Sequence, residues 1–331
     1  MVMLKTAALL VVVLLVLGYV VISNISAAAY WLNYILDPAK GLSLGMVLVI
    51  SLILGVLHGA TPDEHTWPIT FSYAVGSYST KGGVKAGLAF SSGFTVQRAI
   101  LTTLGFLGLA AIYKEYNLDG PVYVIVGIAM TMAGAYILNK GKYIHLPLDR
   151  LLHGKKHHTE TAERVPLHEA ELKKVPLRMA VAHGLIAGWG FGPYAAIITF
   201  ILAPRLPGLI YAPLPGLFFG IGTTIMQMIF GAIFAGLARI KNISENQVAR
   251  IGRKTAGRTL YYGGFMFAII GILIIAFPAL DAMAINTGLV IPNLDSFGMA
   301  TILVLVVVGV FGIGNLAYGI MQVMKQERSA A

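Results

Sequence analysis

Residues 42–57 read LSLGMVLVISLILGVL, and residues 58–68 continue as HGATPDEHTWP. The first stretch is uncharged and close to the roughly 18–20 apolar residues that cross a bilayer as a helix. The second stretch ends that helix, because Pro62 has no N–H to donate and biases Thr61 away from helical angles. Non-helical backbone at membrane depth is tolerated only inside protein or beside a water-filled cavity. The two stretches together predict a membrane helix that is broken at a polar cluster.

The rest of the chain has the composition of a helical membrane protein. Of its 331 residues, 57% are hydrophobic and 11% are charged, and the mean hydropathy is +0.79. A soluble domain would carry roughly 25% charged residues. The apolar segments are continuous and show no alternation, so we expect an all-α integral membrane protein rather than a β-barrel. About eight transmembrane helices are expected, near residues 4–22, 42–57, 86–112, 121–138, 177–202, 213–237, 261–277 and 297–321.

The chain has a net charge of +10, and the distribution of its basic residues predicts how the chain is oriented in the membrane. Basic residues gather near 139–174, near 239–258 and in the tail after the last span, whereas 278–296 contains no lysine or arginine. Cytoplasmic loops carry an excess of Lys and Arg. We therefore expect a multi-pass protein of the cell membrane with both termini and both basic loops in the cytoplasm. The charge is explained by this topology, so no nucleic-acid partner is expected.

The predicted organisation has five parts. The first apolar run, 4–22, also fits a secretory signal peptide, but its length favours an uncleaved helix. The parts are residues 1–41, the N-terminal transmembrane helix or signal peptide with an extracytoplasmic linker; 42–139, a first transmembrane repeat; 140–177, a cytoplasmic histidine-containing loop; 178–280, a second transmembrane repeat; and 281–331, an extracytoplasmic loop, the last transmembrane helix and a cytoplasmic tail.

Two parts of the chain resemble each other. A His-Gly pair stands at the start of both 58–68 and 183–193, and a proline ends both stretches. The glycine-rich stretch 87–93 is similar to 216–222. Under the expected topology these two spans cross in opposite directions. We therefore expect inverted repeats, which are typical of secondary transporters. Superposition of the halves should bring Pro68 onto Pro193 and Gly93 onto Gly222.

The densest polar cluster contains His58, Asp63, Glu64 and His65. The chain has no cysteine, so soft-metal ligands must be His or Met, together with carboxylates. Imidazole suits nickel, cobalt, zinc, copper or iron, and carboxylates compensate the charge of the ion. A broken membrane helix that carries these groups predicts a divalent-cation site, with Thr61 and Trp67 beside the substrate pathway. The alternative is a polar cap where the chain meets cytoplasmic water.

Three further polar residues fall within predicted spans. His183 begins the second His-Gly stretch, so it is expected to contribute a metal ligand from the second half; the alternative is a structural histidine at a helix end. Arg98, beside Gln97, lies about midway along its span, where a charge costs about 2.5–3.5 kcal/mol. We expect Arg98 either to pair with Asp63 or Glu64 or to bind an anionic substrate.

The loop at 140–177 contains five of the eight histidines, together with several glutamates. Tracts rich in histidine and acid can gather metal ions. His153, His157 and His158 are therefore expected to form an accessory metal-binding loop. The alternative is a solvated loop without a metal role.

The cluster resembles the signature of nickel/cobalt transporters of the NiCoT and NicO type, within the LysE-like transporter superfamily. In that signature a His, a four-residue gap and Asp-His lie on the second helix. His58 and Asp63 match the first His and the Asp, whereas Glu64 is inserted and places His65 one residue late. Residues 90–96, FSSGFTV, are similar to a second family motif of Phe-Ser-x-Gly-His-Ser-Thr-Val form, with phenylalanine in place of its histidine. The wider superfamily includes sulfite, sulfonate and amino-acid exporters.

These observations predict a secondary transporter rather than an enzyme, with Ni²⁺ or Co²⁺ as its substrate and no prosthetic group. The sequence has no P-loop, so energy must come from an ion gradient, the membrane potential or a partner subunit. One alternative is a small-anion exporter of sulfite or sulfonate type that uses Arg98. Alternatives of other classes are an intramembrane metal-dependent enzyme, a metallocentre-assembly factor or a non-transporting scaffold, although the sequence lacks a His-Glu-x-x-His motif.

Overall fold

The computed structural model describes residues 41–139, 175–237, 243–289 and 293–330. The predicted first span and the accessory loop with His153, His157 and His158 lie outside the described residues. Within the described ranges the chain is mostly helical.

The helices and one small hairpin follow each other in this order: α3 (Leu44–Ala60), α4 (Trp67–Val75), α5 (Thr80–Phe106), α6 (Ala111–Glu115), α7 (Asp119–Leu138), α10 (Leu177–Ala187), α11 (Pro193–Ala196), η1 (Ile197–Leu202), η2 (Ala203–Arg205), η3 (Leu209–Tyr211), α12 (Leu214–Leu237), α13 (Glu245–Ala276), η4 (Pro278–Leu280), β1 (Ala284–Asn286), β2 (Ser296–Gly298), α14 (Met299–Val304), η5 (Leu305–Gly314) and α15 (Asn315–Ala330). Elements η1 and η5 are π-helical, and the other η elements are 3₁₀ turns. Strands β1 and β2 pair antiparallel, with Ile285 opposite Phe297.

Four helical segments of the described chain are long and apolar enough to cross a membrane: Asp119–Leu138, Leu209–Leu237, Glu245–Ala276 and Met299–Gln326. Leu44–Ala60, Leu177–Ala187 and Pro193–Arg205 are apolar but shorter. The structure is thus a mostly helical chain with apolar helices that can contact a lipid bilayer. It is compatible with the predicted all-α membrane protein.

Polar side chains define where several of the helices begin. The Ser43 hydroxyl accepts a hydrogen bond from the N–H of Met46 at the start of α3. Ser79 does the same for Gly82 in α5. In α13, Ser244 and Gln247 form a reciprocal capping box. Each such cap satisfies backbone N–H groups that have no partner within the helix and typically stabilises it by about 1 kcal/mol.

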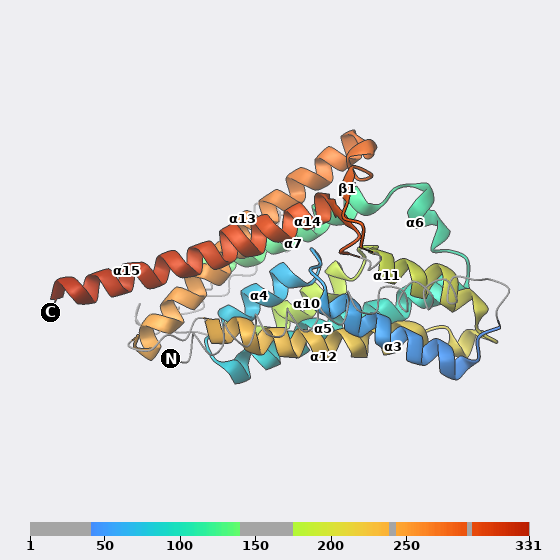
Figure 1. The fold of residues 1–331 in the computed structure, drawn as a ribbon, viewed down its shortest axis with the longest axis horizontal. Helices are drawn as coiled ribbons and strands as arrows, with labels where there is room; N and C mark the ends of the chain where they lie inside the picture. Colours follow the sequence, from blue (N-terminus) through green and yellow to red (C-terminus); the bar gives the residue numbers. More distant parts are fainter. Residues whose placement is uncertain (1–40, 140–174, 238–242, 290–292, 331) are drawn as a thin grey trace, which may run out of the picture.

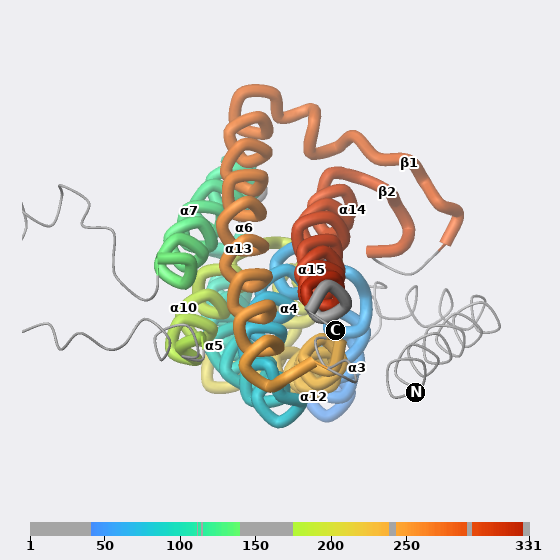
Figure 2. Tube along the Cα trace, turned by 90° about the vertical axis from the view of Figure 1, so that its left-hand side faces the viewer, coloured from blue at the N-terminus to red at the C-terminus, as the bar shows by residue number. Residues whose placement is uncertain are grey.

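The helices α3, α12, α5 and α10 form one packed group, in which each contacts the next in this order. Helix α7 packs along α13. Figure 1 shows α13 and α7 on one side of this group, with α15 running along α13 towards the C-terminus. In the turned view of Figure 2, α13 stands between α7 and the α14–α15 segment. Helix α4 contacts α12, α13 and α5, so it lies where the two sets of helices meet.

Glycines let neighbouring helices of the group approach backbone to backbone. A Cβ at Gly55 of α3 would overlap the carbonyl oxygen of Phe219 in α12. A Cβ at Gly184 of α10 would overlap the carbonyl oxygen of Phe90 in α5 in the same way. Gly55 and Gly184 are 129 residues apart, and so are Phe90 and Phe219. The same helix contact therefore occurs twice at one fixed separation along the chain.

A second pair of contacts repeats with the same separation. A Cβ at Gly222 would overlap the carbonyl oxygen of Leu52, and a Cβ at Gly93 would overlap that of Val181. Gly93 and Gly222 were expected to correspond, and these contacts support that correspondence. The register of 129 residues thus covers the α3–α12 pair and the α5–α10 pair.

The His-Gly pairs do not follow this register. The contacts make Gly184 the counterpart of Gly55, whereas the sequence alignment would make it the counterpart of Gly59. The difference is one helical turn. Pro68 and Pro193 keep the 125-residue separation of the His-Gly pairs, and both lie in the first two positions of the helix that follows the break.

The directions of the four packed helices follow from the same contacts. Helices α3 and α12 run parallel, since Thr223 Oγ1 bonds to Gly55 O and Gln227 Nε2 bonds to Gly59 O, one turn further along both helices. Helices α5 and α12 run antiparallel: Gly83 meets Gly231, Gly87 meets Gln227 and Arg98 meets Gly216. Helices α10 and α5 run parallel: Gly184 meets Phe90 and Gly188 meets Gln97. Helices α3 and α10 therefore run in opposite directions.

Three predicted segments differ from the structure. The expected span at 177–202 is interrupted at 188–192, after α10 ends, and continues as α11, η1 and η2. Helix α13 begins at Glu245 rather than near residue 261, because the capping box starts it ahead of the apolar run. The stretch 278–296, expected as a plain loop, contains η4 and β1 and begins β2.

Adding one methyl group tests the close approach. Gly55→Ala and Gly184→Ala should each lower the melting temperature of the purified protein in detergent, because the methyl group overlaps a neighbouring backbone. Overpacking of this kind typically costs about 1–3 kcal/mol. Gly45→Ala in α3 and Gly236→Ala in α12 are controls, since a Cβ there meets nothing within 4 Å, and a helical Gly-to-Ala exchange then gains up to about 1 kcal/mol. Equal melting temperatures for all four variants would contradict the packing described.

Candidate functional site

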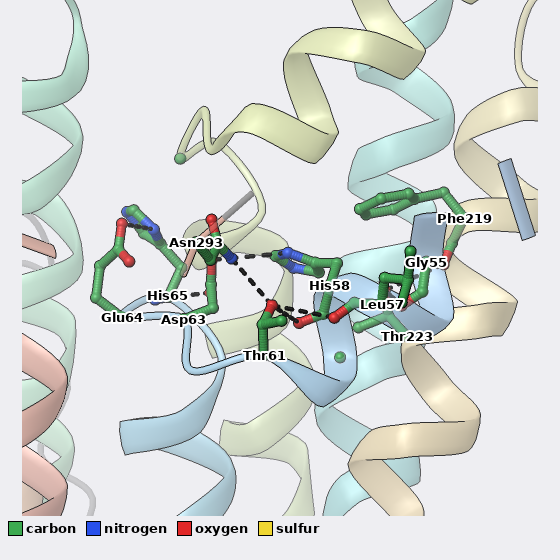
Figure 3. A network of polar contacts seen from close by, with 12 residues as sticks. Gly55, Leu57, His58, Thr61, Asp63, Glu64, His65, Phe219, Thr223 and Asn293 are labelled. Atoms are coloured by element: carbon green, nitrogen blue, oxygen red, sulfur yellow. Dashed lines mark hydrogen bonds and ion pairs between the residues drawn. The ribbon is translucent and has the colours of Figure 1, made fainter. Parts of the chain in front are cut away.

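Residues 61–66 connect α3 with α4, and polar groups of the turn itself organise this connection (Figure 3). The N–H of Thr61 donates back to the last turn of α3. Asp63 Oδ1 accepts from the N–H of His65 at 3.0 Å. The carbonyl oxygen of Asp63 accepts from the N–H of Trp67, also at 3.0 Å. Asp63 thus fixes the turn and starts α4, which explains why the chain can change direction here without leaving these backbone groups unbonded.

The turn brings the predicted ligands together. One ligand atom each of Asp63, Glu64 and His65 lies within 4.8 Å of the others, and all three residues are buried. His58, in the last turn of α3, places Nδ1 3.7 Å from Asp63 Oδ2. The four residues therefore form one buried group, which we call the break cluster. Figure 3 shows Glu64 and His65 on one side of Asp63 and His58 on the other.

Glu64 and His65 form a bonded pair within the break cluster. His65 Nδ1 lies 2.9 Å from Glu64 Oε1, and the Tyr123 hydroxyl donates to the same oxygen at 3.0 Å. The His65 ring also stacks on the Tyr123 ring, with centroids 5.2 Å apart. His65 Nε2 is buried and has no hydrogen-bond partner among the described residues. A histidine whose Nδ1–H is held by a carboxylate has its other nitrogen oriented as a metal ligand.

His58 is held by aromatic rings rather than by hydrogen bonds. Its ring stacks on Phe94, with centroids 5.5 Å apart and an interplanar angle of 12°, and lies 5.1 Å from the Phe219 centroid. Neither ring nitrogen has a hydrogen-bond partner in the described part of the chain. A buried polar atom without a partner is costly, and the nearest carboxylate oxygen, Asp63 Oδ2, lies 3.7 Å from Nδ1.

Arg98 does not make the predicted ion pair. Within the described residues, no carboxylate oxygen lies within 4.0 Å of its guanidinium. Its Nη2 donates instead to the carbonyl oxygen of Gly190 at 3.0 Å, and its Cζ lies 4.5 Å from the Phe94 ring centroid. Arg98 is 1% exposed, and its Nε and Nη1 have no hydrogen-bond partner among the described residues. The expected pairing with Asp63 or Glu64 is therefore wrong as a direct contact.

The chain has one break at 61–66, after α3, and another at 188–192, after α10. Gln227 contacts a carbonyl beside the first break, as Arg98 does beside the second. Its Nε2 donates to the carbonyl oxygen of Gly59 at 3.4 Å, near the broken end of α3. Arg98 and Gln227 are 129 residues apart, and each reaches a carbonyl beside a helix break of the opposite half. Gln97, predicted beside the pathway, is buried next to Gly188, and its amide has no partner in the described residues.

The structure does not bring His183 to the break cluster. Its Nδ1 lies 2.8 Å from the Tyr73 hydroxyl and 2.9 Å from the carbonyl oxygen of Met179. These contacts orient the ring within α10, towards α4. The physical reason is the one-turn difference in register: His58 stands near the broken end of α3, whereas His183 stands about one turn before the end of α10. His183 Nδ1 is thus bonded at the contact between α10 and α4, whereas its Nε2 is buried without a hydrogen-bond partner among the described residues.

Two residues near the break have different surroundings. Trp67 packs on Phe230, with centroids 4.8 Å apart, and so anchors α4 to α12 rather than lining the cluster. Thr61 accepts a hydrogen bond from Asn293 Nδ2 at 3.3 Å. No local pattern in the sequence marks Asn293, a loop residue 232 positions further along the chain that reaches back to the break.

Further carboxyl groups lie at the start of α7 and just after the end of α13. Asp119 Oδ1 accepts from the Tyr113 hydroxyl at 2.8 Å. Partial burial, together with the nearby carboxyl groups of Asp119 and Glu64, raises the pKa of Asp281, which follows α13, to about 6. Acidic side chains therefore continue from the break cluster towards the end of the helices at which α13 stops.

The break cluster brings imidazole nitrogens and carboxylate oxygens together in one buried place. One ligand atom each of Asp63, Glu64 and His65 lies within 4.8 Å of the others, and His58 Nδ1 lies 3.7 Å from Asp63 Oδ2. Mixed imidazole and carboxylate ligands are typical of first-row transition-metal ions.

No family model, curated protein or solved structure matches this chain.

Gly190 provides a direct test of the His65 position. A Cβ at Gly190 would overlap the His65 ring at Nε2. Gly190→Ala should therefore displace the imidazole and weaken nickel binding at least about tenfold, the usual effect of disturbing the support of a metal ligand. Gly208→Ala is the control, because a Cβ there meets nothing within 4 Å. Calorimetric titration of nickel into both variants measures the difference, and unchanged affinity in Gly190→Ala would exclude His65 Nε2 as a ligand.

Proposed function

We propose that this chain is a secondary transporter of a divalent transition-metal cation, nickel or cobalt first, in the cell membrane. The observation that carries the proposal is the break cluster. Asp63, Glu64 and His65 gather their ligand atoms within 4.8 Å, buried, at the point where a helix of the apolar bundle is interrupted. Ionisable groups within membrane helices are costly and are typically retained for ion pathways.

The balance of charge favours a cation. The cluster contains two carboxyl groups, and Arg98 is a permanent positive charge close to it. With His65 neutral, one guanidinium offsets one of the two carboxylates and leaves a net negative charge for the ion. The imidazoles of His58 and His65 then supply the nitrogen ligands that distinguish a transition metal from calcium or magnesium. In this arrangement Arg98 limits how tightly the ion is held, which suits an ion that must also be released.

The architecture supports transport by alternating access. We propose about eight spans in two inverted repeats, with both termini in the cytoplasm. The repeat is supported by the contacts that recur at a separation of 129 residues and by the opposite directions of α3 and α10. Both helices are interrupted and then resume, α3 as α4 and α10 as α11. Paired broken helices near the middle of inverted repeats are typical substrate sites of secondary transporters.

A small-anion exporter is the second candidate, and a specific observation favours it. Nε and Nη1 of Arg98 are buried donors without a partner among the described residues, and arginine binds planar oxyanions through paired N–H groups. Sulfite or a sulfonate could occupy that position. A cation carrier is the better supported of the two functions. Three ligand atoms of the break cluster lie within 4.8 Å of one another with His58 beside Asp63, whereas a single side chain supports the anion carrier.

Protons and metal should compete for the break cluster. Nickel and cobalt affinity should fall as the pH is lowered from about 7.5 to 5.5, because a protonated imidazole has no lone pair to offer. His58→Ala, Asp63→Asn and His65→Ala should each abolish metal-dependent flux in proteoliposomes. A sulfite carrier that depends on Arg98 should keep its affinity over the same pH range or gain some, since Arg98 stays charged. Titration at both pH values and flux assays with nickel, cobalt and sulfite distinguish the two functions.

His183→Ala is the matched control for the histidine variants. It removes a buried histidine of the same bundle whose Nδ1 is already bonded to Tyr73 and Met179. Nickel affinity should therefore be kept in His183→Ala. If wild type binds neither ion, or if the three break-cluster variants transport normally, the cation proposal fails. Sulfite flux that is lost in Arg98→Gln would then establish the anion function.

A further inference from the structure

A polar groove lies between α13 and α15, far along the chain from the break cluster. The structure contains a cavity of about 240 Å³ there. One wall carries Arg250, Lys254 and Arg258, which are four residues apart on α13 and therefore lie on one face of the helix. Arg250 and Lys254 are exposed, and Arg258 is half-buried. Three cationic side chains thus line one side of a single small cavity.

The other wall supplies neutral hydrogen-bonding groups. Asn315, Tyr318 and Gln322 of α15 face the cavity. Asn315 Oδ1 accepts from Arg258 Nη1 at 3.2 Å and so holds that guanidinium in place. Among the described residues that line the cavity, none carries a carboxylate. The lining residues thus combine three positive charges with neutral hydrogen-bonding groups, a composition complementary to an anion with several oxygen atoms.

The groove lies where both helices change from polar to apolar. Beyond Arg258, α13 exposes Tyr262, Phe265 and Ile269. On the other helix, the residues before Asn315 include Val310 and Ile313, which are also exposed. An occupant of the groove would therefore have its charged part among the basic side chains and an apolar surface directly beside it. A lipid offers this combination, whereas a free phosphate ion uses only the charged part.

We propose that the α13–α15 groove binds the phosphate group of an anionic membrane lipid, with the lipid chains along the exposed apolar residues of both helices. Basic pockets between transmembrane helices recognise anionic headgroups in this way. Tyr318 stands at the boundary, a position at which tyrosine is enriched in membrane proteins. The site is separate from the break cluster and does not depend on which ion the protein transports.

The test measures lipid binding by the shift in melting temperature of the purified protein in detergent. Dioctanoyl phosphatidylglycerol should stabilise the protein in a saturable way, whereas dioctanoyl phosphatidylcholine and inorganic phosphate at the same concentrations should not. A lysine or arginine near a membrane surface contributes about fivefold in affinity for anionic lipid. Lys254→Gln should therefore weaken phosphatidylglycerol about fivefold, and Arg250→Gln with Lys254→Gln about 25-fold.

Lys81→Gln with Lys85→Gln is the matched control. These two lysines are also exposed and one turn apart, at the start of α5. They lie at the same end of the bundle as the start of α13, because Gly83 packs on Gly231 near the end of α12. The control should keep wild-type affinity. Equal weakening of both double variants would show a diffuse charge effect and overturn the site, as would phosphate stabilisation equal to that of the lipid. If the double variant does not fold, Lys254→Gln alone decides between these outcomes.

Discussion

A helix that is interrupted inside an apolar bundle leaves carbonyl and N–H groups without partners in the helix and away from water. In this structure, polar groups of the turn and of neighbouring helices bond to several of them. At the first break, Asp63 accepts backbone N–H groups on both its side chain and its carbonyl, and Gln227 reaches the Gly59 carbonyl. At the second, Arg98 reaches the Gly190 carbonyl. Unpaired groups of this kind cost several kcal/mol each in hydrocarbon. The close packing of α3, α12, α5 and α10 is what brings these donors within reach.

The interruption itself could be predicted from the sequence. Pro62, together with the sudden change from apolar to polar residues, indicates where α3 ends, and the structure ends it at Ala60. The grouping of Asp63, Glu64 and His65 also follows from their being neighbours in one turn. The apolar runs locate most of the helices, because burial in lipid requires continuous apolar surface. Local patterns therefore carry the fold class and the core of the candidate site.

The partners of the polar side chains could not be predicted in the same way. Arg98 bonds to a backbone carbonyl 92 residues away, and carbonyls are identical at every position of a sequence. Asn293 reaches Thr61 only because a loop folds back over the break. In the sequence, His183 aligns with His58. The helix contacts shift the two positions by one turn, because the packing of glycines and not the histidine sets the register. Each difference arises from contacts between helices, on which local sequence carries no information.

That one-turn shift has a consequence for stoichiometry. His58 lies beside the interruption that follows α3, whereas the interruption that follows α10 contains glycines and has Arg98 rather than a carboxylate beside it. Under the proposed function and the proposed repeat, one chain then holds one ion and not two. A binding isotherm measured on a single chain is accordingly hyperbolic. Any sigmoidal response to metal concentration must arise between chains.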